Sequence, residues 1–149
     1  MSLEKATHTL VRLATEVEFF RGLDPNDVAK IFAKGTTQRV AKGQTIFLKG
    51  TTGNTMYVIL GGKVGVFDGR KQIATLRQGA MLGEMALTTH EPRSASAVAL
   101  EDSHLFMLNE TTFERLLTKR AAIRILLNII HTLSRRLKEA NVQLQQPRQ

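Results

Sequence analysis

The chain has 149 residues, a length that fits one domain with a core large enough to fold without covalent cross-links. It contains no cysteine, which excludes disulfide frameworks and thiolate metal sites. The formal net charge is +8, and residues 119–149 carry +6 of it, with seven Lys and Arg against the single acid Glu139. We interpret this excess as a solvated helix face, so nucleic-acid binding by this chain alone is not expected. Neither a secretory signal nor a membrane span is apparent, and we expect a cytoplasmic protein.

Two helices are predicted at the N-terminal end, over residues 9–35. The first is indicated by apolar residues at helical spacing, which are Leu10, Leu13, Val17 and Phe20. For the second, Asp24 is suited to cap the helix, Pro25 fits its first position, and Gly35 can end it. The second helix is therefore expected over residues 25–34.

Residues 36–108 change to short β-branched runs separated by turn residues. Turn signals fall at residues 42–43, 49–50, 53–54, 61–62, 68–69 and 101–102. Short strands at this spacing are typical of a sandwich, a barrel or a jelly roll.

Helices are predicted again over residues 109–145, where Asn109 can cap the first of them. The last helix carries apolar residues spaced alternately by three and four: Ile123, Leu126, Ile130, Leu133, Leu137, Ala140 and Leu144. This a/d heptad seam is typical of a coiled coil. We expect the early part of the helix to pack on its own domain and the later part on a second copy, giving a homodimer through residues 123–144. The alternative is that the whole helix packs on its own domain.

Residues 81–98, MLGEMALTTHEPRSASAV, place one carboxylate and one guanidinium at the two ends of a loop of small residues. Small residues let a ligand approach the backbone, and the GEMAL turn can offer N–H groups to an anion. Arg93 fits a phosphate group, whereas Glu84 suits sugar hydroxyls. The loop therefore suits a sugar phosphate. The alternative is a surface ion pair between Glu84 and Arg93.

The stretch LGEMALTTHEPRSASA resembles the phosphate-binding cassette of the cyclic nucleotide-binding domain family. That cassette shows Phe-Gly-Glu-x-Ala-Leu and, after a few residues, Pro-Arg-Ala/Ser/Thr-Ala. The matching residues are Gly83, Glu84, Ala86, Leu87, Pro92, Arg93, Ser94 and Ala95, while Leu82 replaces the usual Phe. The similarity extends over roughly residues 15–143, including the glycine-punctuated strands.

The resemblance implies one α+β domain over residues 1–149. Its antiparallel β jelly-roll barrel (a double-stranded β-helix) would span residues 36–108, hold the cassette at 82–96, and be flanked by N-terminal helices and a long C-terminal helix. Arg93 would pair with the cyclic phosphate, and Glu84 would accept from the ribose 2′-hydroxyl. Backbone N–H groups of Ala86 and Ser94 would also reach the phosphate. The implied ligand-binding residues are Gly83, Glu84, Met85, Ala86, Leu87, Arg93, Ser94 and Ala95.

The function implied by the resemblance is a regulatory sensor that binds cAMP, or less favourably cGMP, and transmits occupancy through its C-terminal helix. We expect no other cofactor, no metal and no catalysis, because the four histidines are scattered and no nucleophile constellation is present. We expect Ser94 to lie near the base, with Asn128 and His131 facing it from the last helix. The alternatives are a nucleotide-independent dimerisation or interaction module of the same fold, or a fragment of a larger regulator, channel or kinase.

Overall fold

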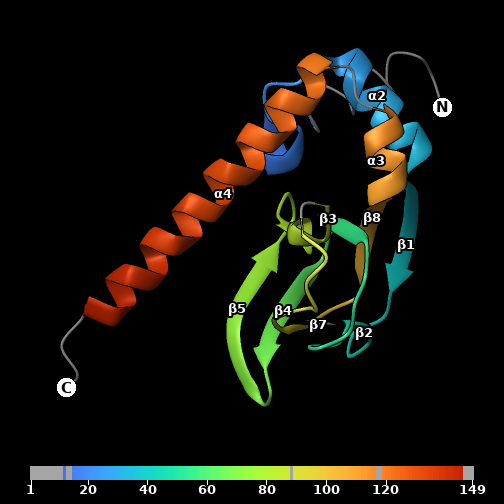
Figure 1. The fold of residues 1–149 in the computed structure, drawn as a ribbon. Coiled ribbons are helices and arrows are strands. Elements are labelled where there is room, and N and C mark those ends of the chain that lie inside the picture. Colours follow the sequence, from blue (N-terminus) through green and yellow to red (C-terminus); the bar gives the residue numbers. More distant parts are fainter. Residues whose placement is uncertain (1–11, 13–14, 88, 117–118, 146–149) are drawn as a thin grey trace.

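The computed structural model describes residues 12, 15–87, 89–116 and 119–145 (Figure 1). The chain begins with the 3-10 helix η1 (Glu18–Phe20) and the helix α2 (Pro25–Lys34). The strands and the turn between them are β1 (Thr36–Val40), β2 (Thr45–Phe47), β3 (Thr55–Gly61), β4 (Lys63–Asp68), β5 (Lys71–Arg77), β6 (Met81–Leu82), the 3-10 helix η2 (Glu84–Leu87), β7 (Ser96–Ala99) and β8 (Ser103–Asn109). Helices α3 (Glu110–Leu116) and α4 (Lys119–Gln145) follow.

The strands form two antiparallel sheets with the orders β1-β8-β3-β6 and β2-β7-β4-β5. A core lies between them, where Ile59 and Leu105 of the first sheet pack with Val64 and Ala97 of the second. The predicted α+β architecture, with antiparallel strands between N-terminal and C-terminal helices, is confirmed. Among the described residues no strand of one sheet pairs with a strand of the other. Closure into a jelly-roll barrel therefore stays a prediction.

The N-terminal helices cover the outer face of the first sheet. Helix α2 has the predicted bounds, and the Asp24 side chain caps it by accepting from the Asn26 N–H at 2.8 Å. Of the first predicted helix, Arg12, Thr15 and Glu16 are helical, whereas Leu10 and Leu13 lie outside the described residues. The Phe pair of η1 is fully buried and belongs to a second core, which also contains Phe106 of β8 and Ile125 of α4.

Helix α4 packs on the domain through a face that is not the heptad seam. Its buried residues are Ala121, Ile125, Ile129 and Thr132. The seam residues Ile123, Ile130 and Leu137 are 56%, 58% and 63% exposed, and only Leu133 of the seam packs on the core. Figure 1 shows α4 running away from the helices near the N-terminus, past the sheets, toward the C-terminus. The early part of α4 does meet the domain, as expected, but its apolar seam is left uncovered apart from Leu133.

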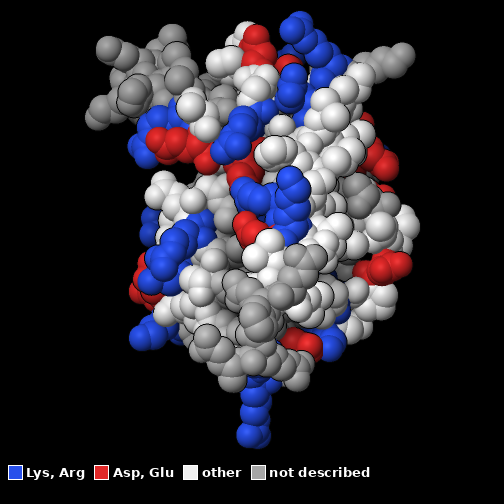
Figure 2. Space-filling view, turned by 90° about the vertical axis from the view of Figure 1, so that its left-hand side faces the viewer, with Lys and Arg blue, Asp and Glu red and all other residues white. Residues whose placement is uncertain are grey.

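Charged side chains are mixed on the face seen in Figure 2. Among the residues drawn in colour, Lys and Arg are interspersed with Asp, Glu and uncharged residues and do not form one continuous basic patch. Among the described residues, no helix combines the length and apolar character that a membrane crossing requires. The same residues contain no cluster of three or more His, Asp or Glu able to hold a metal ion.

Candidate functional site

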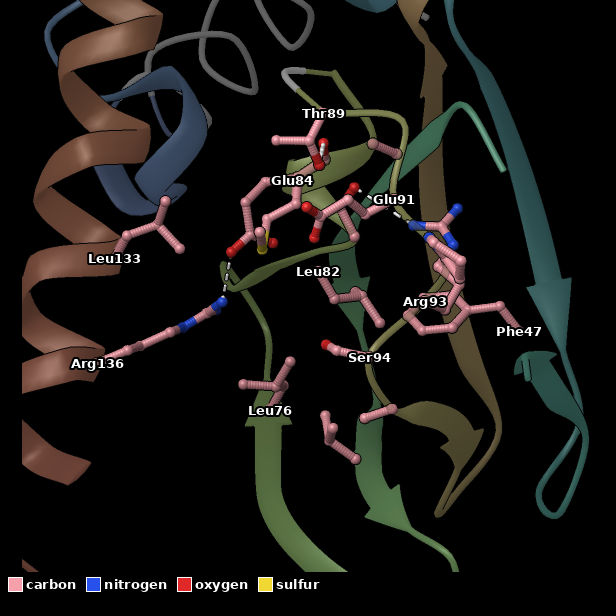
Figure 3. A pocket seen from close by; sticks show the side chains of 16 residues that line it. Phe47, Leu76, Leu82, Glu84, Thr89, Glu91, Arg93, Ser94, Leu133 and Arg136 are labelled. Carbon is pink, nitrogen blue, oxygen red and sulfur yellow. Dashed lines mark hydrogen bonds and ion pairs between the residues drawn. The ribbon is translucent and has the colours of Figure 1, made fainter. Parts of the chain in front are cut away.

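A cavity of about 230 Å³ lies between the 83–95 loop, the second sheet and α4 (Figure 3). Seven of the eight predicted ligand-binding residues line it: Gly83, Glu84, Met85, Ala86, Arg93, Ser94 and Ala95. The eighth, Leu87, is 7% exposed and belongs to the core beneath the helices. Other lining residues come from elsewhere in the chain, namely Phe47, Val66, Leu76, Leu133 and Arg136. The loop identified in the sequence thus supplies one side of the cavity.

The loop begins with a sharp turn that only glycine fits. Gly83 has a φ of +72°, and a Cβ atom there would lie 2.5 Å from Nη1 of Arg93. The chain then forms the single turn η2, as predicted for GEMAL, and the Ala86 N–H donates to the Gly83 carbonyl at 3.0 Å. In this conformation the Ala86 N–H, predicted for the phosphate, is already engaged inside the turn.

Arg93 is a partly buried cation without an acidic partner among the described residues. Its Nη2 donates to the Thr55 carbonyl at 2.7 Å and its Nη1 to the Gly83 carbonyl at 3.4 Å. Its Cζ lies 4.4 Å from the ring centroid of Phe47. Burial lowers the pKa of Arg93, although Tyr57 and Glu84 counteract part of this effect. A guanidinium that has lost solvent and gained no counter-ion favours an anion beside it.

Glu84 is 4% exposed and is paired with α4. Its Oε1 accepts from Nη1 of Arg136 at 2.6 Å, and Nη2 of Arg136 donates to the Met81 carbonyl at 2.9 Å. The alternative of a surface ion pair between Glu84 and Arg93 is therefore wrong. Sequence reasoning missed Arg136, because its contact with Glu84 depends on where α4 runs.

The polar side chains predicted to face the base from α4 do not reach the cavity. Nδ2 of Asn128 donates to the carbonyls of Phe19 at 3.1 Å and Arg21 at 2.8 Å, so it anchors α4 to η1. His131 is exposed and is not part of the cavity wall. Glu18 of η1 adds to the anchor by accepting from Thr132 and Arg135. The α4 side chains that do line the cavity are Leu133 and Arg136.

The sequence of this chain matches a known protein family. Residues 37–120 match the family described as "Cyclic nucleotide-binding domain". The chain belongs to the cyclic nucleotide-binding domain family.

Two relatives of this cyclic nucleotide-binding domain are longer proteins. It is 33% identical over 102 residues to the cAMP-dependent protein kinase regulatory subunit of Hypocrea atroviridis. The aligned residues make up 68% of this chain and 22% of that protein. It is 33% identical over 130 residues to the Cyclic AMP receptor protein of Thermus thermophilus. Here the aligned residues make up 84% of this chain and 59% of that protein. The chain therefore spans less than two thirds of either relative.

Solved structures agree with the fold of the cyclic nucleotide-binding domain. The Catabolite Activator Protein of Thermus thermophilus superposes with a TM-score of 0.75 at 32% identity, over 85% of this chain and 61% of that one. A cyclic nucleotide-binding domain from Methylobacillus flagellatus gives 0.81 at 20% identity, over 98% and 87% of the two chains, and supports the fold alone. The family match includes the whole cassette but ends before Leu133 and Arg136. The α4 wall of the cavity therefore lies outside the residues that the family model matches.

Proposed function

We propose that this domain binds cAMP, with cGMP as a weaker ligand, in the cavity between the cassette and α4. The proposal rests on the Arg93 guanidinium, which is partly buried, has no acidic partner among the described residues, and lines the same cavity as Glu84. Two relatives named for cAMP support this choice of ligand. In this proposal the domain is a regulatory sensor and not an enzyme.

The two charged ends of the cavity suit different parts of a cyclic nucleotide. A phosphate beside Arg93 would supply the counter-charge that the guanidinium lacks, through short charge-assisted hydrogen bonds. A carboxylate has two oxygens, so Glu84 can accept from the ribose 2′-hydroxyl with one while Arg136 holds the other. The apolar side chains of Val66, Leu76 and Leu133 leave a wall suited to the flat base.

Occupancy would be transmitted through α4. The cavity, at about 230 Å³, is smaller than the ligand pockets of about 300–1,000 Å³ that proteins commonly use. A nucleotide that fills it would press on Leu133 and Arg136, the two α4 residues in its wall. Arg136 already connects α4 to Glu84 and to the Met81 carbonyl, so a ligand at Glu84 changes the contacts that position the helix.

Thermal unfolding tests the proposed ligand. A ligand that binds only the folded state at one hundred times its Kd stabilises that state by about 2.7 kcal/mol. We expect saturating cAMP to raise the melting temperature by several degrees, cGMP to do so less, and adenosine, which lacks the phosphate, to have almost no effect. An unchanged melting temperature with millimolar cAMP would favour the nucleotide-independent interaction module.

Base preference should respond to Ser94, which lines the cavity directly after Arg93. Its hydroxyl can accept from the 2-amino group of a guanine in the syn form. One neutral hydrogen bond contributes about 0.5–1.5 kcal/mol, so Ser94 alone should change the cAMP-to-cGMP ratio by about tenfold at most. We expect Ser94→Thr to shift competition binding toward cGMP and Ser94→Ala to shift it toward cAMP. A ratio that is equal in all three proteins would show that Ser94 does not contact the base.

The exposed seam of α4 supports a second proposal, a parallel homodimer through residues 123–144. Ile123, Ile130 and Leu137 lie on one stripe of the helix and are each more than half exposed. Apolar residues at a and d positions gain stability when a second helix covers them. In a parallel pair of helices each of these positions contacts the same position of the second copy, so this one stripe is enough to form the dimer interface.

Sedimentation of a seam variant tests the dimer. Leu137→Arg would place two like charges in the seam without partners, and it should convert the dimer to a monomer. His131→Arg is the matched control, because it adds the same charge to an exposed position of the same helix outside the seam. A parent protein that is already monomeric at roughly tens of micromolar would reject the dimer.

A further inference from the structure

The chain from Phe47 to Thr55, which joins β2 to β3, contacts both the backbone and the side chain of Arg93. The backbone of Arg93 is fixed to this segment by two hydrogen bonds of 2.8 Å, from the Gly50 N–H to the Arg93 carbonyl and from the Arg93 N–H to the Thr51 carbonyl. The side chain then lies over the ring of Phe47, with its Cζ 4.4 Å from the ring centroid (Figure 3). Backbone and side chain of Arg93 are thus held by residues more than forty positions earlier in the sequence.

Backbone atoms surround the Arg93 guanidinium on the sides that do not face Phe47. The carbonyls of Thr55 and Gly83 accept from the two terminal nitrogens of the guanidinium. A Cβ atom at Gly53 would lie 2.8 Å from Nη2, and one at Gly83 would lie 2.5 Å from Nη1. Two glycines therefore make room for the guanidinium, and the ring of Phe47 limits its movement on the remaining face.

Phe47 is itself held in place. It packs against the core between the two sheets, and its ring centroid is 5.9 Å from that of Tyr57, which is 9% exposed. The pairing of β2 with β7 is irregular between Thr45 and Phe47, and such irregularities re-aim a side chain. The ring can therefore belong to the core and also line the cavity.

An aromatic ring attracts a cation through its face and uses none of the in-plane N–H donors. A carboxylate in the same place would neutralise Arg93 and occupy the donors that a phosphate needs. Two of the five N–H groups of the guanidinium donate to the carbonyls above, which leaves donors for a ligand. We propose that Phe47 is a positioning residue that holds Arg93 in its anion-binding orientation while leaving its charge and donors available. This inference rests on the proposed function, because the anion is the phosphate of the nucleotide.

The test compares Phe47→Leu, which keeps an apolar side chain but removes the ring face, with Phe47→Tyr, which keeps the ring. Phe47→Leu should weaken cAMP binding by about tenfold, the size of a cation–π contribution, and leave adenosine binding within about twofold of the parent. Phe47→Tyr should bind cAMP like the parent. Leu76→Ala is the comparison variant, since it removes apolar wall away from the guanidinium and should weaken both ligands equally.

A second readout needs no nucleotide. In the free protein the ring current of Phe47 should shift the Arg93 side-chain N–H proton resonances, and Phe47→Leu should abolish that shift while Phe47→Tyr retains it. Unaltered Arg93 resonances in Phe47→Leu, or an equal loss of cAMP and adenosine affinity, would overturn the inference. Failure of the parent to bind cAMP would instead reject the proposed function. The Arg93 resonances, titrated with inorganic phosphate, would then still decide the role of Phe47.

Discussion

Replacing Arg93 with alanine should weaken cAMP binding by about 30-fold or more, measured by competition with a fluorescent cyclic nucleotide. Removing one partner of a buried charge pair costs on the order of 2–5 kcal/mol, and Arg93 is the guanidinium of the cassette in this cavity. The same change should leave the fold of the free protein intact by circular dichroism. It removes the hydrogen bonds of Arg93 to the Thr55 and Gly83 carbonyls and its contact with Phe47, but it also removes the desolvation cost of a cation without an acidic partner among the described residues.

Arg39→Ala is the matched control for this substitution. Arg39 is exposed on β1, a strand that pairs with β8 on the other sheet, so its removal changes the net charge equally without touching the cavity. Its affinity for cAMP should equal that of the parent. If Arg93→Ala and Arg39→Ala bind cAMP alike, the phosphate does not lie beside Arg93.

Replacing Glu84 with glutamine should weaken cAMP binding by about tenfold and narrow the gap between cAMP and 2′-deoxy-cAMP. Hydrogen bonds to a charged group contribute about 1.5–3 kcal/mol, and glutamine keeps the shape of the side chain while removing the charge. The substitution would also weaken the ion pair that attaches α4, because Glu84 is the charged partner of Arg136 in this structure.

Two measurements separate the ribose contact from the helix contact. Arg136→Met keeps Glu84 but removes its partner, and it should reduce stability because the carboxylate is 4% exposed. It should also preserve the preference for cAMP over 2′-deoxy-cAMP, whereas Glu84→Gln should not. Equal affinity of the parent for the two nucleotides would show that Glu84 serves only to hold α4.

Local signals were sufficient to predict most secondary structure. The cap at Asp24 and the cap at Asn109 mark the starts of α2 and α3, and both side chains accept the expected backbone hydrogen bonds. Gly35 ends α2 as predicted, but with extended backbone, at φ −78° and ψ 177°. Glycine is needed there because a Cβ atom would lie 2.2 Å from the ring of Phe106. This requirement comes from a contact with β8, which is distant in the sequence, so the local pattern around Gly35 could not predict it.

Helix α4 shows why periodicity alone does not assign a face. The helix carries one apolar stripe through Ile125 and Ile129, which is buried, and another through Ile123 and Ile130, which is exposed. The heptad spacing identifies the second stripe but not which stripe meets the domain. The choice depends on the anchor between Asn128 and η1, a contact across more than one hundred residues.

The candidate site also combines residues that the sequence could identify with residues that depend on tertiary packing. The cassette is contiguous in sequence, so its residues could be identified from spacing and resemblance. Phe47 and Arg136 come to the cavity from β2 and α4, about 46 and 43 residues away from Arg93. Their roles depend on the packing of two sheets and on the direction of one helix, and neither carries a motif of its own.

A calorimetric titration of cAMP into the parent protein tests the central claim most directly. We predict saturable binding of one cAMP per chain, weaker binding of cGMP and of 2′-deoxy-cAMP, and much weaker but measurable binding of adenosine at high concentration. Binding of adenosine as tight as that of cAMP would contradict the assignment of Arg93 to the phosphate. Absence of heat and of competition at millimolar cAMP would contradict the proposal that the cavity is a cyclic nucleotide site.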